Sequence, residues 1–119
     1  MEIFVVVKSS REIKAEYQVK IKVPAVPRIG ETITIQRVDN NGDTITHKSE
    51  DENLGFYVEQ ESLIVRDIHW TMAYPKNDTQ KSSGKVSEIY VVCDPAIAKY
   101  DSPQHKASAG PNAPKIEFM

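Results

Sequence analysis

The sequence predicts a mainly β domain: a small antiparallel barrel, SH3-like or partly open, or a small sandwich of five to seven strands. Three observations support this class. Apolar runs with β-branched residues or strict alternation recur through residues 2–93. An Asn-Gly pair, typical of tight hairpin turns, lies between two of these runs. The 119 residues suffice for one hydrophobic core and are too few for two independent ones.

The first two predicted strands cover residues 2–8 and 16–23. The first is a continuous apolar run, which is typical of a strand covered on both faces. In the second, alternation places one set of apolar side chains on a single face, namely Tyr17, Val19, Ile21 and Val23. We expect a hairpin to connect the two strands.

A third strand is predicted over residues 31–38, followed by a hairpin turn at Asn41-Gly42. A two-residue type I′ turn would place Val38 opposite Ile45. Val38 has the opposite parity to the isoleucines earlier in its strand, however. Either a bulge near Arg37 resets the register, which we favour, or the hairpin tip extends past the core with two mixed faces.

Further strands are predicted over residues 54–58, 63–70 and 86–93, with a turn near 60–62 and a polar loop at 76–85. The predicted domain therefore spans residues 1–94. Residues 95–119 are rich in Pro, Ala and Ser, which predicts an extended C-terminal tail. Within this tail, Ile116 and Phe118 are candidates for strand addition to a sheet edge.

Charge and motif content narrow the classes of function. A net charge of −2 does not favour nucleic-acid binding. The N-terminal apolar run is short and follows an acidic residue, so we expect no signal peptide, no membrane span and a cytoplasmic location. The single cysteine, Cys93, is expected to be a buried thiol. His47, His69 and His105 are isolated from one another, and the glycines are scattered, so neither a metal nor another cofactor is expected.

The strongest polar cluster is the run from Arg66 to Trp70. On a strand, Asp67 and His69 share one face, while Arg66 and Trp70 lie on the other. In one hypothesis Asp67 orients His69 as a general base; in another, Arg66 and Trp70 form a ligand shelf. The interpretation we favour is structural, with Trp70 in the core and the charged residues at the surface.

Three segments resemble small bacterial and phage SH3-like barrel proteins of unassigned function. These are the Pro-x-x-Gly-Glu turn at Pro27–Glu31, a strand with Val65, Ile68 and Trp70, and the closing apolar strand at 86–92. The resemblance covers about residues 24–93. It implies an SH3-like barrel and identifies no active site.

We therefore expect a non-enzymatic module of the inhibitor, immunity or adaptor type that binds another protein or itself. One alternative is a small-molecule binder with its site at Arg66, Trp70 and Tyr74. A second is a minimal hydrolase that uses Asp67 and His69, with His47 as a possible third group. The residues proposed to contact a ligand or partner are Arg66, Asp67, His69, Trp70, Tyr74, Ile116 and Phe118.

Overall fold

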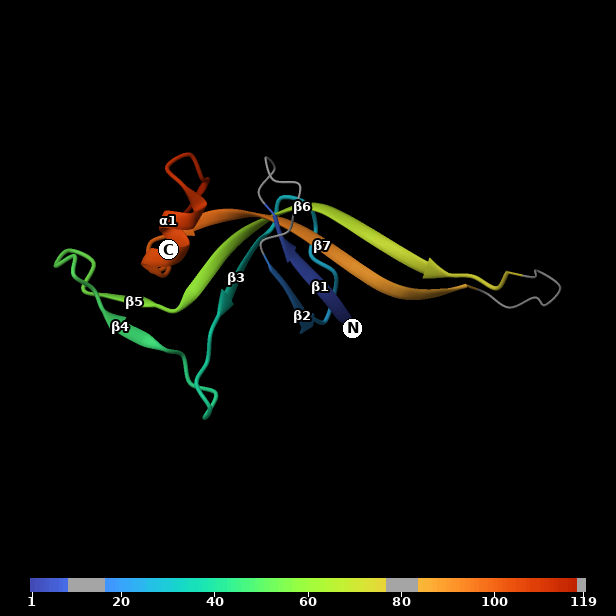
Figure 1. The fold of residues 1–119 in the computed structure, drawn as a ribbon, viewed down its shortest axis with the longest axis horizontal. Coiled ribbons are helices and arrows are strands. Elements are labelled where there is room, and N and C mark those ends of the chain that lie inside the picture. The colour runs from blue at the N-terminus through green and yellow to red at the C-terminus, as the bar shows by residue number, and fades with distance from the viewer. Residues whose placement is uncertain (9–16, 77–83, 118–119) are drawn as a thin grey trace. The chain divides into compact units, whose positions relative to one another are not determined.

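The computed structural model describes residues 1–8, 17–76 and 84–117, and it confirms the mainly β class (Figure 1). These residues form the strands β1 (Glu2–Val7), β2 (Tyr17–Lys22), β3 (Thr32–Gln36), β4 (Thr46–Lys48), β5 (Phe56–Val58), β6 (Gln60–Ala73), β7 (Lys85–Ala98) and β8 (Lys115–Ile116), and the helix α1 (Pro103–Ala109).

The main sheet has the strand order β2-β1-β7-β6-β3, with β8 also paired to β7, and β4 and β5 form a separate sheet. Within the described residues, β2 and β3 end this order and do not pair with each other, so the sheet is open. The pairings of β1 and of β8 with β7 are parallel. The main sheet is therefore mixed, whereas sequential hairpins predict only antiparallel pairs.

The chain divides into two compact units, and the first consists of Met1–Gly30 and Val65–Cys93. Its central strand, β1, pairs with β2 through Val5↔Val19 and with β7 through Val5↔Val91. Alternate side chains of β1 and β7 are buried, and these are Ile3, Val5, Val7, Ile89, Val91 and Cys93. On the other face of the two strands Phe4 stacks on Tyr90 with ring centroids 5.4 Å apart.

The second unit consists of Glu31–Ile64 and Asp94–Met119. Here β3 pairs with the first residues of β6, through Ile33↔Leu63. Among its described residues, the buried side chains are four polar and three apolar ones: Gln60, Ser62, Asp101 and Ser102, with Leu63, Ala96 and Ala98. A core of this kind requires each buried polar group to find a hydrogen-bond partner.

The predicted turn at residues 60–62 is wrong, because β6 begins at Gln60 and the chain bends at Glu59 instead. The polar side chains of Gln60 and Ser62 resemble a turn in the sequence, yet both are buried in a strand. Their hydrogen bonds to the buried Asp101 explain how a strand accommodates them.

The prediction of an extended tail from residue 95 is also wrong. β7 continues through Ala98, and α1 follows, with Pro103 in its first turn and Gly110 at its C-terminus. Proline preset to helical φ and a glycine at φ 86° are standard helix boundaries. Ile116 lies in β8 and pairs with Ala98 of the same chain, while Phe118 lies outside the described residues.

The hairpin after β3 also differs from the type I′ prediction. That turn needs positive φ at two central residues, but only Gly42 has it in this turn. The turn is instead held by Asp39, whose carboxyl group accepts hydrogen bonds from the amides of Asn41 and Asp43. Val38 bridges Thr44 rather than Ile45 and is 56% exposed. The exposed side chain fits the alternative of a hairpin tip outside the core.

Candidate functional site

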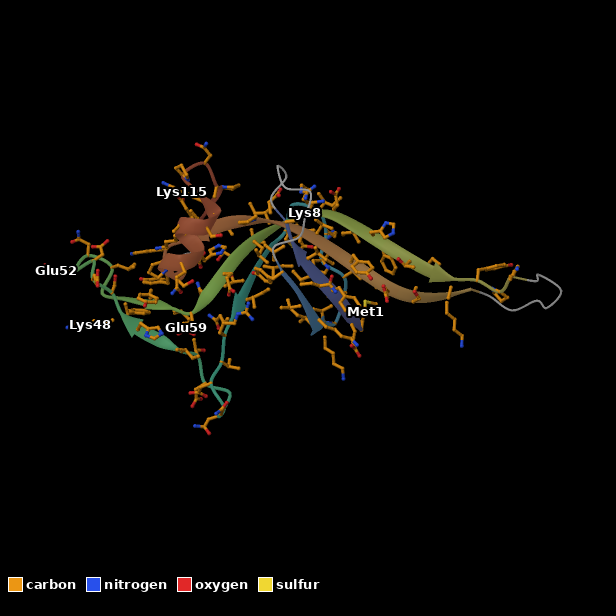
Figure 2. The ribbon with its side chains drawn as sticks, viewed as in Figure 1. Met1, Lys8, Lys48, Glu52, Glu59 and Lys115 are labelled. Atoms are coloured by element: carbon orange, nitrogen blue, oxygen red, sulfur yellow. The ribbon has the colours of Figure 1, made fainter. Side chains whose placement is uncertain are left out.

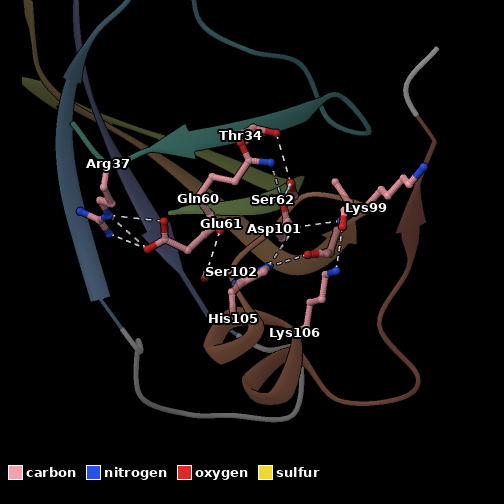
Figure 3. Close-up of polar contacts among 12 residues, drawn as sticks. Thr34, Arg37, Gln60, Glu61, Ser62, Lys99, Asp101, Ser102, His105 and Lys106 are labelled. Carbon is pink, nitrogen blue, oxygen red and sulfur yellow. Dashed lines mark hydrogen bonds and ion pairs between the residues drawn. The ribbon is translucent and has the colours of Figure 1, made fainter. Parts of the chain in front are cut away.

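Two features are candidates for a functional site. One is a buried polar cluster in the second unit, which we call the Asp101 network and which consists of Gln60, Ser62, Asp101 and His105 (Figure 3). The other is a row of exposed side chains in the first unit, which we call the β6 stripe and which consists of Trp70, Met72 and Tyr74. No helix among the described residues is long and apolar enough to cross a membrane.

The Asp101 carboxyl group is fully buried and accepts three hydrogen bonds. Its Oδ1 accepts from Gln60 Nε2 and from Ser62 Oγ, each at 2.8 Å. Its Oδ2 accepts from the backbone amide of Ala98, also at 2.8 Å. These contacts connect the first residues of β6 to the segment between β7 and α1, so the carboxyl group stabilises the second unit.

The geometry of His105 argues against a Ser-His-Asp catalytic site here. Its Nε2 lies 2.6 Å from the carbonyl oxygen of Ala96 and 3.8 Å from Asp101 Oδ2. A carbonyl oxygen only accepts, so His105 Nε2 carries a proton. Ser62 Oγ donates to the carboxyl group and not to the imidazole. The arrangement therefore lacks a base positioned to activate the hydroxyl group.

The Arg66 to Trp70 run lies on β6 in the first unit. Arg66 Nη1 forms an ion pair with Asp67 Oδ2 at 3.1 Å, and Arg66 Nη2 donates to the carbonyl oxygen of Lys8. The His69 ring lies 6.5 Å from that of Tyr90. No hydrogen bond joins Asp67 to His69 in the described part of the chain, so the geometry gives no support to a general-base pair.

His47, the third group of the hydrolase hypothesis, belongs to the second unit. Figure 2 labels Lys48, the last residue of β4, and Glu59, which follows β5. Beside them, His47 Nε2 lies 2.5 Å from Glu59 Oε1, and its ring stacks on Tyr57 at 5.1 Å. His47 therefore has its own carboxylate partner. No group of three or more His, Cys, Asp or Glu side chains suited to a metal ion occurs in the described ranges.

The β6 stripe occupies alternate positions along an extended segment. Trp70 and Met72 share one face of β6, and Tyr74 follows at the next alternate position. Their exposed fractions are 46%, 59% and 61%. The favoured sequence interpretation placed Trp70 in the core, and its exposure contradicts that. Met72 was not selected from the sequence, although its spacing from Trp70 and Tyr74 is the signal that identifies it.

Tyr74, which follows β6, also lies close to Gly84, which precedes β7. A Cβ atom added to Gly84 would lie 3.0 Å from Tyr74 Cδ2 and 3.1 Å from the carbonyl oxygen of Ala73. Because Gly84 has no side chain, it leaves the space that the Tyr74 ring occupies. Val86, close by on β7, is 46% exposed as well.

Comparison with known proteins gives no further guidance to the site. No protein-family model, curated protein or solved structure matches this chain. The candidate site therefore depends on the side-chain arrangement alone.

Proposed function

We propose that this protein is a binding module that recognises a protein partner through the β6 stripe. The observation that carries the proposal is the exposure of three large side chains at successive alternate positions, Trp70, Met72 and Tyr74. Trp, Tyr and Met are enriched at protein interfaces, where they supply large apolar areas at moderate entropic cost. An exposed apolar row of this kind is costly in water unless a partner covers it.

The polar groups near the stripe support binding rather than catalysis. Arg66 shares the Trp70 face of β6 and is ion-paired with Asp67, and 32% of the Arg66 side chain is exposed. A partly exposed, ion-paired guanidinium group of this kind is suited to the polar rim of an interface. Around an apolar centre such a rim supplies specificity, because a partner must match both the stripe and the charges beside it.

Site-specific photocrosslinking tests the proposal. Trp70→benzoylphenylalanine is introduced into the full chain in its host cells, and Ile29→benzoylphenylalanine serves as the matched control. Ile29 is 66% exposed and lies in the same unit, but outside the stripe. We expect a defined crosslinked protein at position 70 and not at position 29.

The crosslinked protein is then purified and titrated against the wild-type chain and Met72→Ser. We expect saturable binding that Met72→Ser weakens at least about tenfold, as is typical for an interface anchor. Equal crosslinking at positions 70 and 29, or binding that Met72→Ser leaves unchanged, would show that the stripe is not a binding surface.

A further inference from the structure

We infer that the partner of the β6 stripe is a second copy of this chain, joined by antiparallel pairing of β6 with β6 around a two-fold axis at Trp70. This inference rests on the proposed function and specifies its partner. Three features carry it: an open strand edge, the absence of the charges that normally protect such an edge, and a self-complementary sequence.

Among the described residues, the second half of β6 has an open edge. In the sheet order, β6 has β7 on one side and β3 on the other. β3 pairs only with Gln60–Ile64, and the amide of Gly30 donates to the carbonyl oxygen of Val65. Along residues 67–73, no described segment forms backbone hydrogen bonds on that side. An edge of this length is a template for another strand.

From Ile68 to Ala73 the residues of this edge offer no protection against pairing. Proteins usually block exposed edges with charged side chains, proline or a bulge. From Ile68 to Tyr74 the chain contains neither proline nor Lys, Arg, Asp or Glu. The nearest charged residues and prolines flank this stretch, at Arg66-Asp67 and at Pro75-Lys76. The unprotected stretch therefore has defined ends, which suits a specific contact between two copies.

Two-fold symmetry limits the register of such a pair. Two identical antiparallel strands place one residue opposite itself, so the numbers of every facing pair add to the same even sum. With Trp70 on the axis, Ile68 faces Met72 and Arg66 faces Tyr74. The first pair is apolar, and the second places a guanidinium group beside an aromatic ring.

The neighbouring registers are less favourable. With Thr71 on the axis, Arg66 faces Lys76, and like charges directly opposite destabilise a strand pair. With His69 on the axis, Tyr74 faces Ile64, which already pairs with Thr32 of β3. The register centred on Trp70 avoids both conflicts, and it places the β6 stripes of the two copies side by side.

Sedimentation velocity over a concentration series tests self-association. We expect the wild-type chain to form a dimer, and we expect Trp70→Lys to raise the dissociation constant at least about tenfold, because two like charges would then meet on the axis. Ile29→Lys is the control and is expected to dimerise normally. Far-UV circular dichroism checks that the variants fold. If Trp70→Lys does not fold, Met72→Lys serves as the second variant that places like charges at the contact.

Disulfide trapping tests the register. His69 and Thr71 face each other across the axis, so a mixture of tagged His69→Cys and untagged Thr71→Cys chains is expected to form mixed disulfides. Facing residues lie within the Cα separation that a disulfide bond allows. The two copies of His69 are offset by two positions along the paired strands, so they are less well placed to form a disulfide with each other. The wild-type chain controls for Cys93, which is buried.

The outcomes separate this inference from the function on which it rests. A concentration-dependent dimer with predominantly mixed disulfides supports it. A monomer at all concentrations, together with crosslinking of position 70 to a different protein, overturns the self-pairing and leaves the binding function intact. A dimer in which each variant crosslinks mainly to itself overturns the register. A monomer with no crosslinked protein at position 70 overturns both proposals.

Discussion

Replacing Asp101 with alanine is expected to destabilise the second unit strongly. Truncation removes one acceptor group and leaves three buried donors without it, on Gln60, Ser62 and Ala98. Each unsatisfied buried donor costs about 1–3 kcal/mol, and relief from burying a carboxyl group offsets part of the sum. We therefore expect a loss of about 3–5 kcal/mol, a large share of the stability of an ordinary domain.

Urea unfolding followed by far-UV circular dichroism measures this loss, and hydrogen exchange of residues 60–63 and 96–102 locates it. Asp101→Asn retains the shape and one carbonyl oxygen, so we expect it to cost about 1–3 kcal/mol. Asp67→Ala is the control, because this exposed ion pair contributes under about 1 kcal/mol. If Asp101→Ala unfolded at the same urea concentration as Asp67→Ala, the network would not stabilise the unit.

Two further predictions concern the ribbon of β6 and β7. Gly84→Ala is expected to displace the Tyr74 ring and cost about 1 kcal/mol, measured by urea unfolding, because the new Cβ meets the ring at 3.0 Å; an unchanged midpoint would contradict the packing. The pKa of Tyr90 is raised above its usual 10.0. The largest cause is the hydrogen bond that Tyr90 donates to the Glu88 carboxylate, and burial and the negative charge of Glu88 raise the pKa further. The contact therefore contributes its full stabilisation at pH values below the pKa of Tyr90 in the unfolded chain. This contribution is lost as the pH rises through the higher pKa of Tyr90 in the folded protein. Ultraviolet titration should place the Tyr90 transition lower in Glu88→Gln, and identical curves would refute the assignment.

Apolar runs predicted β1 and the central part of β7, and strict alternation predicted β2. In β1 and in this part of β7 alternate side chains are buried, as Val5 and Val91 show. The parallel pairing of β1 with β7 was not predictable in the same way. Alternation states which side chains share a face, but it does not state which strand lies alongside.

The first residues of β6 and the C-terminal segment show the opposite case. Gln60 and Ser62 look like turn residues, and the segment around Asp101 looks like a linker. Each is buried because the other supplies its hydrogen-bond partner, and the partners are about forty positions apart in the sequence. No local pattern contains that information, so a polar core is recognised only from the fold.

The β6 stripe combines both kinds of information. The sequence by itself determined that Trp70 and Met72 share a face, because a strand alternates at every residue. Only the tertiary structure decided whether that face is core or surface: β3 pairs with β6 no further than Ile64, and Trp70 is 46% exposed. The physical reason is that alternation fixes side-chain direction, whereas burial depends on which other segments pack against that face.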